Sequence, residues 1–64
     1  MPELSNREKE VLILSGQGLT MEVIANILYV SIDTIKFHKR NIFRKLSCKN
    51  ISEAILAASN YAII

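Results

Sequence analysis

Apolar residues recur at three- and four-residue intervals along most of the chain, and polar residues divide them into four segments. This spacing is typical of amphipathic helices. At the start, Ser5 stands three residues before Glu8, the pattern of a capping box in which each side chain satisfies the other's backbone amide. The first helix is therefore predicted to run from here to near Ser15. Gly16 and Gly18 follow, and glycine tolerates the left-handed conformation that ends many helices.

The remaining three segments also carry helix start signals. Serine, threonine and asparagine are favoured N-caps, and the candidates are Thr20 for the second helix, Ser31 for the third, and Asn50 or Ser52 for the fourth. These helices are predicted to end near Leu28, Leu46 and Tyr61, in that order. No stretch alternates apolar and polar residues cleanly, and no hairpin turn signal is present. The pattern therefore predicts an all-α fold, a four-helix bundle that forms one domain over residues 1–64.

Length and composition narrow the class of protein. The chain has 64 residues, half of them hydrophobic, which suits one small folded domain rather than a disordered segment. No apolar run approaches the roughly 20 residues that span a bilayer, and no secretory signal is recognisable. Cys48 and His38 are each the only residue of their type, so a disulfide, a metal site and a cofactor are not expected. A reducing, cytoplasmic setting fits this composition best.

The sequence contains no recognisable arrangement for catalysis. A single histidine, a single cysteine and scattered carboxylates do not form a nucleophile, base and orienting group that the sequence can bring together. Gly16 and Gly18 form G-x-G without a third glycine, and a helix precedes them instead of a strand, which argues against a nucleotide-binding loop. The chain is therefore not expected to be an enzyme.

The charges are segregated along the chain. The net charge is +2, but residues 1–33 and 51–64 both carry more acidic than basic residues. Residues 34–50 contain no acidic residue and all the excess basic charge, from Lys36, Lys39, Arg40, Arg44, Lys45 and Lys49. Clustered basic charge favours a polyanionic partner, although a solvated helix with acidic neighbours would show the same pattern.

A helical wheel divides the third predicted helix into two faces. At roughly 100° per residue, Ile35, Ile42 and Leu46 fall within about 20° of one direction and form a buried stripe. The opposite face carries Phe37, Arg40, Asn41 and Arg44, with Lys36 beside it. Arginine pairs with guanine, asparagine with adenine, and an apolar side chain can contact a thymine methyl group. This face therefore predicts DNA readout in the major groove; the alternative is a surface helix with an incidental phenylalanine.

The spacing of the second and third helices supports the DNA interpretation. About three residues separate Leu28 from the third helix, and a short helix, a tight turn and a helix with a basic outer face make a helix-turn-helix. Lys39 lies nearer the core edge of the wheel, so its ammonium group suits a phosphate better than a base.

The chain resembles the LuxR/FixJ-type (GerE-like) helix-turn-helix domain of bacterial transcription regulators. The resemblance covers nearly the whole chain with every spacing kept. It rests on Leu4-Ser5-x-Arg7-Glu8-x-Glu10-Val11-Leu12, Gly18-Leu19-Thr20-x-Glu22-x-Ile24-Ala25, Leu28, Ser31-x-x-Thr34-Ile35-Lys36-x-His38, Asn41-Ile42-x-x-Lys45-Leu46 and Asn50-x-x-Glu53-Ala54.

This resemblance implies double-stranded DNA binding as a homodimer on a palindromic site, with the third helix as recognition helix. The implied base contacts are at Lys36, Phe37 and Arg40, and the wheel adds Asn41. Phosphate contacts are expected from the amino ends of the second and third helices, and from flanking side chains, which gives Thr20, Ser31, Thr34, His38, Lys39, Arg44 and Lys45. A regulatory domain ahead of this module is also implied, so the chain is expected to be the output domain of a larger regulator; the alternative is a naturally short family member.

The fourth helix carries a second apolar stripe. Ile51, Ala54, Ile55 and Ala58 suit the core, whereas Leu56, Ser59 and Ile63 lie on another face. A second apolar face favours a partner helix, and the dimer contact is predicted at Ser52, Ile55, Leu56 and Ser59. The alternatives are a frayed carboxyl terminus, or a protein-interaction module that uses Phe37 and this helix.

Two positions depart from the family pattern. The family usually has arginine where Ile51 stands, and a basic or small polar residue where Met21 stands. A polar contact near the fourth helix and a phosphate contact from the second helix are therefore in doubt.

Overall fold

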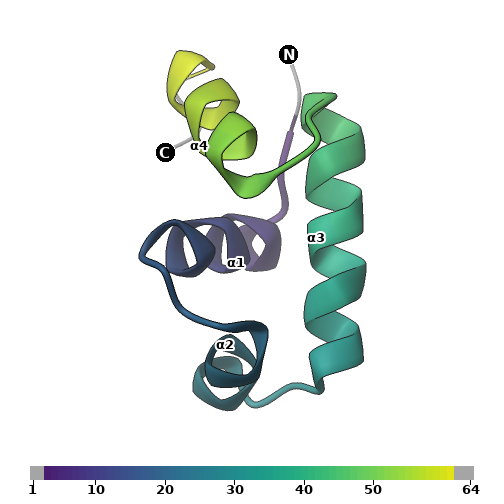
Figure 1. Cartoon of the computed structure of the whole chain (residues 1–64). Helices are drawn as coiled ribbons and strands as arrows, with labels where there is room; N and C mark the ends of the chain where they lie inside the picture. The colour runs from purple at the N-terminus through teal and green to yellow at the C-terminus, as the bar shows by residue number, and fades with distance from the viewer. Residues whose placement is uncertain (1–2, 62–64) are drawn as a thin grey trace.

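The computed structural model describes residues 3–61, which form four α-helices and, within that range, no strand. Helix α1 spans Asn6–Gly16, α2 Met21–Leu28, α3 Ile32–Leu46 and α4 Ile51–Asn60 (Figure 1). The all-α prediction is confirmed, and every helix boundary lies within a residue or two of its predicted position. No helix in this part of the chain combines the length and apolarity needed to cross a bilayer.

Each helix begins at a side chain that accepts a hydrogen bond from a first-turn amide. Ser5 caps α1, and the reciprocal bond from the Ser5 amide to the Glu8 carboxylate completes the capping box. Thr20 and Ser31 cap α2 and α3 as predicted. For α4 the cap is Asn50, whose Oδ1 accepts from the Glu53 amide at 2.9 Å, and Ser52 lies inside the helix. Of the two predicted caps, Asn50 is therefore the one that caps α4.

The carboxyl ends of the helices differ from the expectation about glycine. Gly16 is the last residue of α1, and the left-handed residue that follows the helix is Gly18, with φ of 86°. Helices α2 and α3 end at Tyr29 and Ser47, which are left-handed without being glycine (φ of 58° and 53°). Left-handed backbone costs a residue with a Cβ atom about 1 kcal/mol or more. At both turns the amide of the next residue, Val30 or Cys48, donates to a carbonyl of the preceding helix at 3.0 Å and closes the turn.

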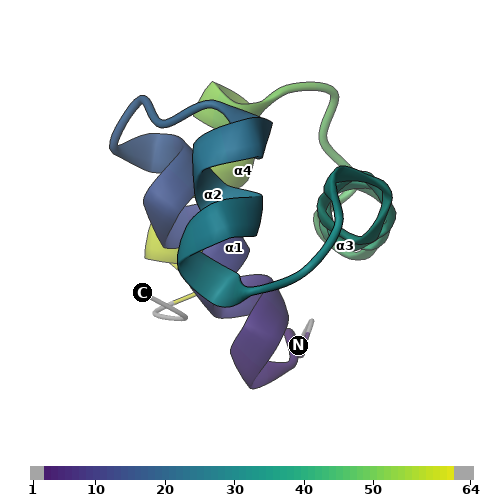
Figure 2. The ribbon, with the colours of Figure 1, turned by 90° about the horizontal axis from the view of Figure 1, so that it is seen from below.

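Helix α1 lies at the centre of the fold. It packs against α2, α3 and α4, whereas α3 contacts both α2 and α4 and no α2–α4 contact is found among the described residues. In Figure 1, α2 and α4 lie toward opposite ends of α3. Figure 2 looks along α3 and shows the other three helices on one side of it. The opposite side of α3 is therefore left uncovered by the fold.

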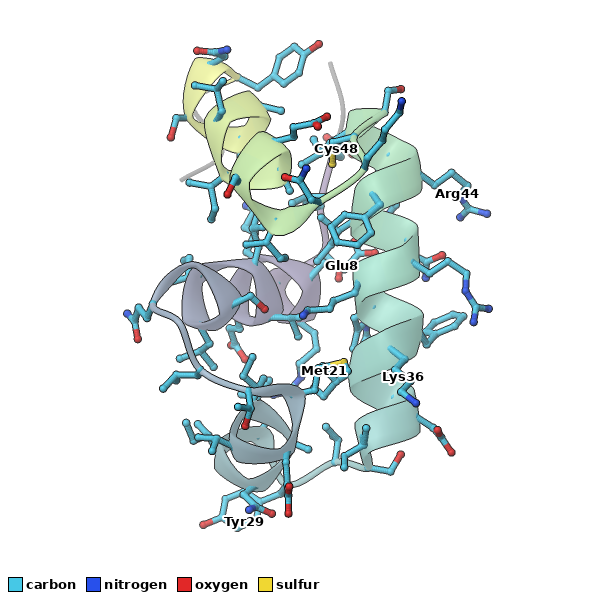
Figure 3. The ribbon with its side chains drawn as sticks, viewed as in Figure 1. Glu8, Met21, Tyr29, Lys36, Arg44 and Cys48 are labelled. Carbon is cyan, nitrogen blue, oxygen red and sulfur yellow. The ribbon has the colours of Figure 1, made fainter. Side chains whose placement is uncertain are left out.

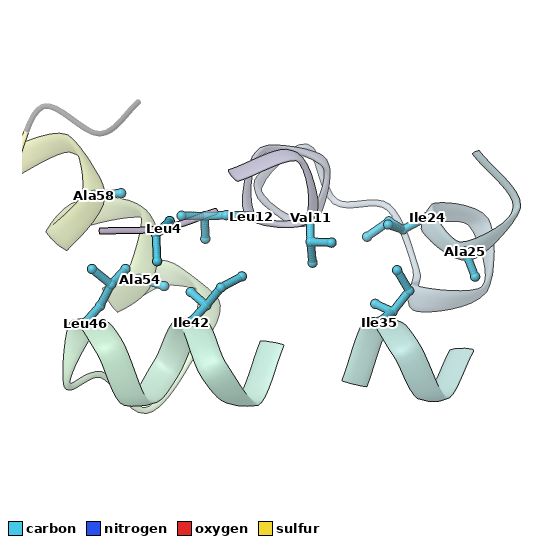
Figure 4. Packing of buried hydrophobic residues seen from close by; sticks show 10 residues of the cluster. All are labelled: Leu4, Val11, Leu12, Ile24, Ala25, Ile35, Ile42, Leu46, Ala54 and Ala58. Carbon is cyan, nitrogen blue, oxygen red and sulfur yellow. The ribbon is translucent and has the colours of Figure 1, made fainter. Parts of the chain in front are cut away.

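The core is made of apolar side chains from all four helices and from Leu4, just before α1. Its members are Leu4, Val11, Leu12, Ile24, Ala25, Ile35, Ile42, Leu46, Ala54 and Ala58. Figure 4 shows Ile35, Ile42 and Leu46 pointing from α3 toward this cluster. The predicted buried stripe of the third helix is confirmed.

Gly16 allows α1 and α4 to approach closely. A Cβ atom at this position would lie 2.8 Å from Cδ1 of Ile55, which is closer than real carbon contacts. Ile55 is half-buried and packs against the core cluster. Much of the Ile55 side chain is therefore used within the domain rather than left for a partner.

Candidate nucleic-acid interface

The uncovered side of α3 carries basic and aromatic side chains. Lys36, Phe37, Arg40 and Arg44 are exposed, and Asn41 is half-buried. Phe37 exposes 55% of its surface, an unusual placement for a large aromatic residue that usually dominates cores and interfaces. Figure 3 shows Arg44 pointing away from α1 and α4. The predicted outer face therefore exists as an open surface.

Two residues lie at the borders of this outer face. The ring of His38 is half-buried and meets the ring of Phe37 edge-on, with centroids 5.9 Å apart at 61°. Lys39 is also half-buried, as the wheel predicted for a residue near the core edge. His38 and Lys39 thus flank the outer face instead of standing at its centre.

Asn41 and Arg44 contact each other across one helical turn. Arg44 Nη2 donates to Asn41 Oδ1 at 3.2 Å, so the asparagine amide group keeps its donors free while its oxygen is occupied. Bidentate pairing with adenine needs both the oxygen and the nitrogen of an asparagine side chain. Because an amide oxygen has two lone pairs, the contact with Arg44 leaves Asn41 one acceptor position for such a pair.

The amino ends of α2 and α3 are both built by local hydrogen bonds. Thr20 Oγ1 accepts from the Val23 amide at 3.2 Å. Ser31 Oγ accepts from the Thr34 amide at 3.1 Å and lies 2.9 Å from Thr34 Oγ1. Helix amino termini carry partial positive charge and unpaired amides, and both features favour a phosphate.

Helices α2 and α3, joined by Tyr29, Val30 and Ser31, form a helix-turn-helix. Tyr29 is 94% exposed at the tip of the turn, and Figure 3 shows it pointing away from the bundle. The turn contains no glycine, and Tyr29 takes the left-handed conformation that glycine often supplies.

The two departures from the family pattern both fall on residues that pack inward. Met21 and Ile51 are half-buried against the core cluster, and Figure 3 places Met21 between α2 and α3. Neither side chain has a polar group to offer at its helix start, and the loss of those two contacts stays a prediction.

Lys45 is placed differently from the other basic residues of α3. Its Nζ donates to Glu8 Oε1 at 2.7 Å, which joins the carboxyl-terminal part of α3 to the start of α1. Glu8 itself is buried, with 3% of its surface exposed. Sequence reasoning identified Glu8 only as part of the capping box, because a contact between residues 37 positions apart leaves no local signal.

The environment of Glu8 favours its charged form. Burial raises the pKa of this carboxyl group, but the hydrogen bonds from Lys45 and Ser5, with the positive charge of Lys45, outweigh burial and hold the pKa below its usual value of 4.5. A group whose pKa is lowered by folding stabilises the folded state above its unfolded pKa.

We expect the stabilisation from Glu8 to disappear in acid. It should be fully present above about pH 4.5 and be lost as the pH falls through the lower pKa of the folded state. Urea unfolding of the parent chain and of Glu8→Gln, between pH 7 and pH 2, measures this contribution. The stability difference between the two proteins should shrink in acid; a difference that stays constant would contradict the assignment.

The predicted dimer residues lie on α4. Ser52, Leu56 and Ser59 are exposed, with Leu56 at 63%, whereas Ile55 is half-buried against α1. Ile63, which the sequence placed on the same stripe, lies outside the described residues. Within the described residues, the second stripe is thus exposed at Leu56 and Ser59, and Ile55 lies at its border with the core.

Metal binding finds no support in residues 3–61, where no three histidine, cysteine, aspartate or glutamate side chains gather closely enough to hold an ion. Cys48 is half-buried. Burial raises the pKa of its thiol, and the negative charge of nearby Glu53 raises it further by a smaller amount.

Comparison with known proteins agrees with this architecture. The family described as "Bacterial regulatory proteins, luxR family" matches residues 2–58. The chain is 40% identical over 55 residues, or 86% of its length, to the transcriptional activator protein SolR of Ralstonia solanacearum. It is 33% identical over 61 residues, or 95% of its length, to the response regulator protein VraR of Staphylococcus aureus.

The chain therefore belongs to the luxR family of bacterial regulatory proteins. This membership supports a role in DNA-binding transcription regulation. The matched stretch makes up 23% of SolR and 29% of VraR, so the chain spans about a quarter of the length of these relatives.

Proposed function

We propose that this chain is the sequence-specific, double-stranded DNA-binding domain of a bacterial transcription regulator, with α3 as the recognition helix in the major groove. The observation that carries the proposal is the uncovered face of α3, which is basic, has an exposed Phe37 and contains no acidic side chain after Asp33. Membership of a family of transcription regulators supports binding rather than catalysis as the function. Such a regulator would act in the cytoplasm, where bacterial DNA lies.

Base readout is assigned to four side chains of the outer face. Arg40 and Lys36 are suited to the O6 and N7 acceptors of guanine, and Phe37 to a thymine methyl group. Asn41 is suited to adenine, because its oxygen keeps a second lone pair beside the one that accepts from Arg44. All four lie within two turns around the middle of α3, so one helix inserted in the major groove could present them together.

Phosphate contacts are assigned to residues around this face. Thr20 and Ser31 lie at the amino ends of α2 and α3, and Thr34 sits in the first turn of α3. His38, Lys39 and Arg44 extend from its borders. Such contacts set the position of the domain on DNA and carry most sequence-independent affinity. Lys45 Nζ donates to Glu8 Oε1 at 2.7 Å, so the phosphate contact that the sequence predicts for Lys45 is left out of this proposal.

We also propose that the domain binds a palindromic site as a homodimer through α4, with Ser52, Leu56, Ser59 and the outer part of Ile55 at the contact. The exposure of Leu56 supports this arrangement. Two recognition helices related by such a dimer would lie about one turn of DNA apart. The greater length of the relatives supports the prediction that this domain is the output part of a regulator with an amino-terminal regulatory domain.

A second candidate function is a protein-interaction module. The exposure of Phe37 and Leu56 favours it, because exposed apolar side chains mark protein contacts as well as DNA contacts. In this alternative the basic residues of α3 would only be solvated.

Salt dependence separates the two functions. On DNA, the logarithm of the affinity should fall linearly with the logarithm of the salt concentration, by about 0.9 for each phosphate neutralised. Titration of mixed-sequence duplexes at several salt concentrations measures this slope. Absence of salt-sensitive binding would reject the DNA proposal and favour the protein-interaction module.

A further inference from the structure

Glu8 and Lys45 form an ion pair that links the first turn of α1 to the last turn of α3. A single carboxylate oxygen, Glu8 Oε1, accepts from Lys45 Nζ at 2.7 Å and from the Ser5 amide at 2.8 Å. The side chain of Glu8 is 4% exposed and that of Lys45 is 36% exposed. Within residues 3–61, Lys45 is the only basic residue of α3 in an ion pair.

The position of Lys45 on α3 would otherwise suit a phosphate contact. Lys45 follows Asn41 by four residues and His38 by seven, so the three side chains lie along the same side of the helix. His38 and Asn41 border or belong to the proposed DNA face. An unpaired lysine in this row would therefore present its ammonium group beside the groove, as the sequence interpretation assumed.

The pairing makes that use of Lys45 unfavourable. If Lys45 turned toward a phosphate, it would leave the Glu8 carboxylate buried without its cation, and unpaired buried charges are strongly destabilising. The Ser5 amide holds the carboxylate in place through the capping box, so Glu8 cannot follow the lysine to the surface. The charge of Lys45 is thus neutralised before DNA arrives.

We propose that Glu8 limits the sequence-independent affinity of the domain for DNA: it retains Lys45 and thereby lowers the number of α3 cations available to DNA phosphates. This inference rests on the proposed function. Phosphate contacts raise affinity for every sequence, whereas base contacts raise affinity for the cognate site. By withholding one cation, Glu8 lowers affinity for random and cognate DNA alike and leaves every base-reading side chain in place.

The test compares four variants of this chain with the parent on one random-sequence duplex: Glu8→Gln, Lys45→Met, the double variant, and Glu10→Gln as a matched control. Glu10 also lies on α1 and has a cationic partner, but that partner is Arg7, so its loss frees no α3 cation. Glutamine at position 8 keeps an oxygen that can accept from the Ser5 amide. The affinity of each protein is measured over a range of salt concentrations.

Glu8→Gln should steepen the salt slope by about 0.9 and tighten random-DNA binding roughly three- to tenfold at 0.1 M salt. Lys45→Met and the double variant should keep the parent slope, as should Glu10→Gln. A Lys45→Met slope shallower by about 0.9 would overturn the inference, because Lys45 would then already contact a phosphate. An unchanged slope in folded Glu8→Gln would overturn it as well.

Two further measurements distinguish failure of this inference from misfolding of a variant and from failure of the proposed function. Circular dichroism establishes which variants fold; if Glu8→Gln or Lys45→Met does not, the double variant, which removes both charges of the pair, decides, because its slope must equal that of the parent. The parent titration reports on the proposed function. Absence of salt-sensitive binding by the parent would reject both, whereas normal parent binding with a shallower Lys45→Met slope would reject only the role of Glu8.

Discussion

Replacing Ile42 with alanine is expected to destabilise the domain by about 2–5 kcal/mol, which is the usual cost of truncating a fully buried aliphatic side chain. Ile42 is 0% exposed in the middle of α3 and points into the core cluster (Figure 4). A core this small supplies about 3–5 kcal/mol of net stability, so the variant should be marginally stable or unfolded at room temperature. Urea unfolding followed by circular dichroism measures the loss.

Ile27→Ala is the matched control for Ile42→Ala. This substitution removes the same atoms from α2, but 48% of the surface of Ile27 is exposed. It should therefore lower the free energy of unfolding by about 1 kcal/mol or less. Equal destabilisation by the two substitutions would show that α3 does not pack through the Ile35, Ile42 and Leu46 stripe. There would then be no structural reason for the opposite face of α3 to point toward solvent.

Replacing Arg40 with alanine is expected to weaken binding to a cognate DNA site by about 1–3 kcal/mol, which is roughly a five- to 150-fold loss of affinity. Binding to random DNA should fall much less, because base contacts discriminate between sequences and phosphate contacts do not. Arg40 is exposed on the outer face of α3, with no hydrogen bond from its side chain to another residue in the described range. Fluorescence titrations with both duplexes measure the two affinities.

Arg7→Ala provides the control for charge. Arg7 is an exposed arginine of α1 that pairs with Glu10 at 3.1 Å. Its removal should leave the ratio of cognate to random affinity unchanged. If Arg40→Ala lowers both affinities equally, Arg40 contacts phosphate instead of a base, and the assignment of base readout to it is wrong.

The helices and their starts could be predicted because their signals are local. Ser5, Thr20 and Ser31 each cap a helix through an amide three residues ahead, and the spacing of a cap and its amide is visible in the sequence. The buried stripe of α3 could be predicted equally well, because the helical repeat alone determines which of its residues face inward. Family resemblance and the wheel agreed on the outer face for the same reason.

The features that could not be predicted depend on how helices meet or on backbone conformation. The Glu8–Lys45 pair requires the crossing of α1 and α3, which no local pattern contains. The close approach of Gly16 to Ile55 likewise arises between two helices. Tyr29 adopts a left-handed conformation that side chains with a Cβ atom usually avoid, so its residue type gave no indication of it.

The central claim is that the uncovered face of α3 reads a defined DNA sequence. Selection of bound duplexes from a random DNA pool by this chain tests it most directly. We predict enrichment of a single consensus, made of two inverted half-sites whose centres lie about one helical turn apart. Recovery of sequences no different from the starting pool, under salt conditions where DNA is bound, would contradict the claim.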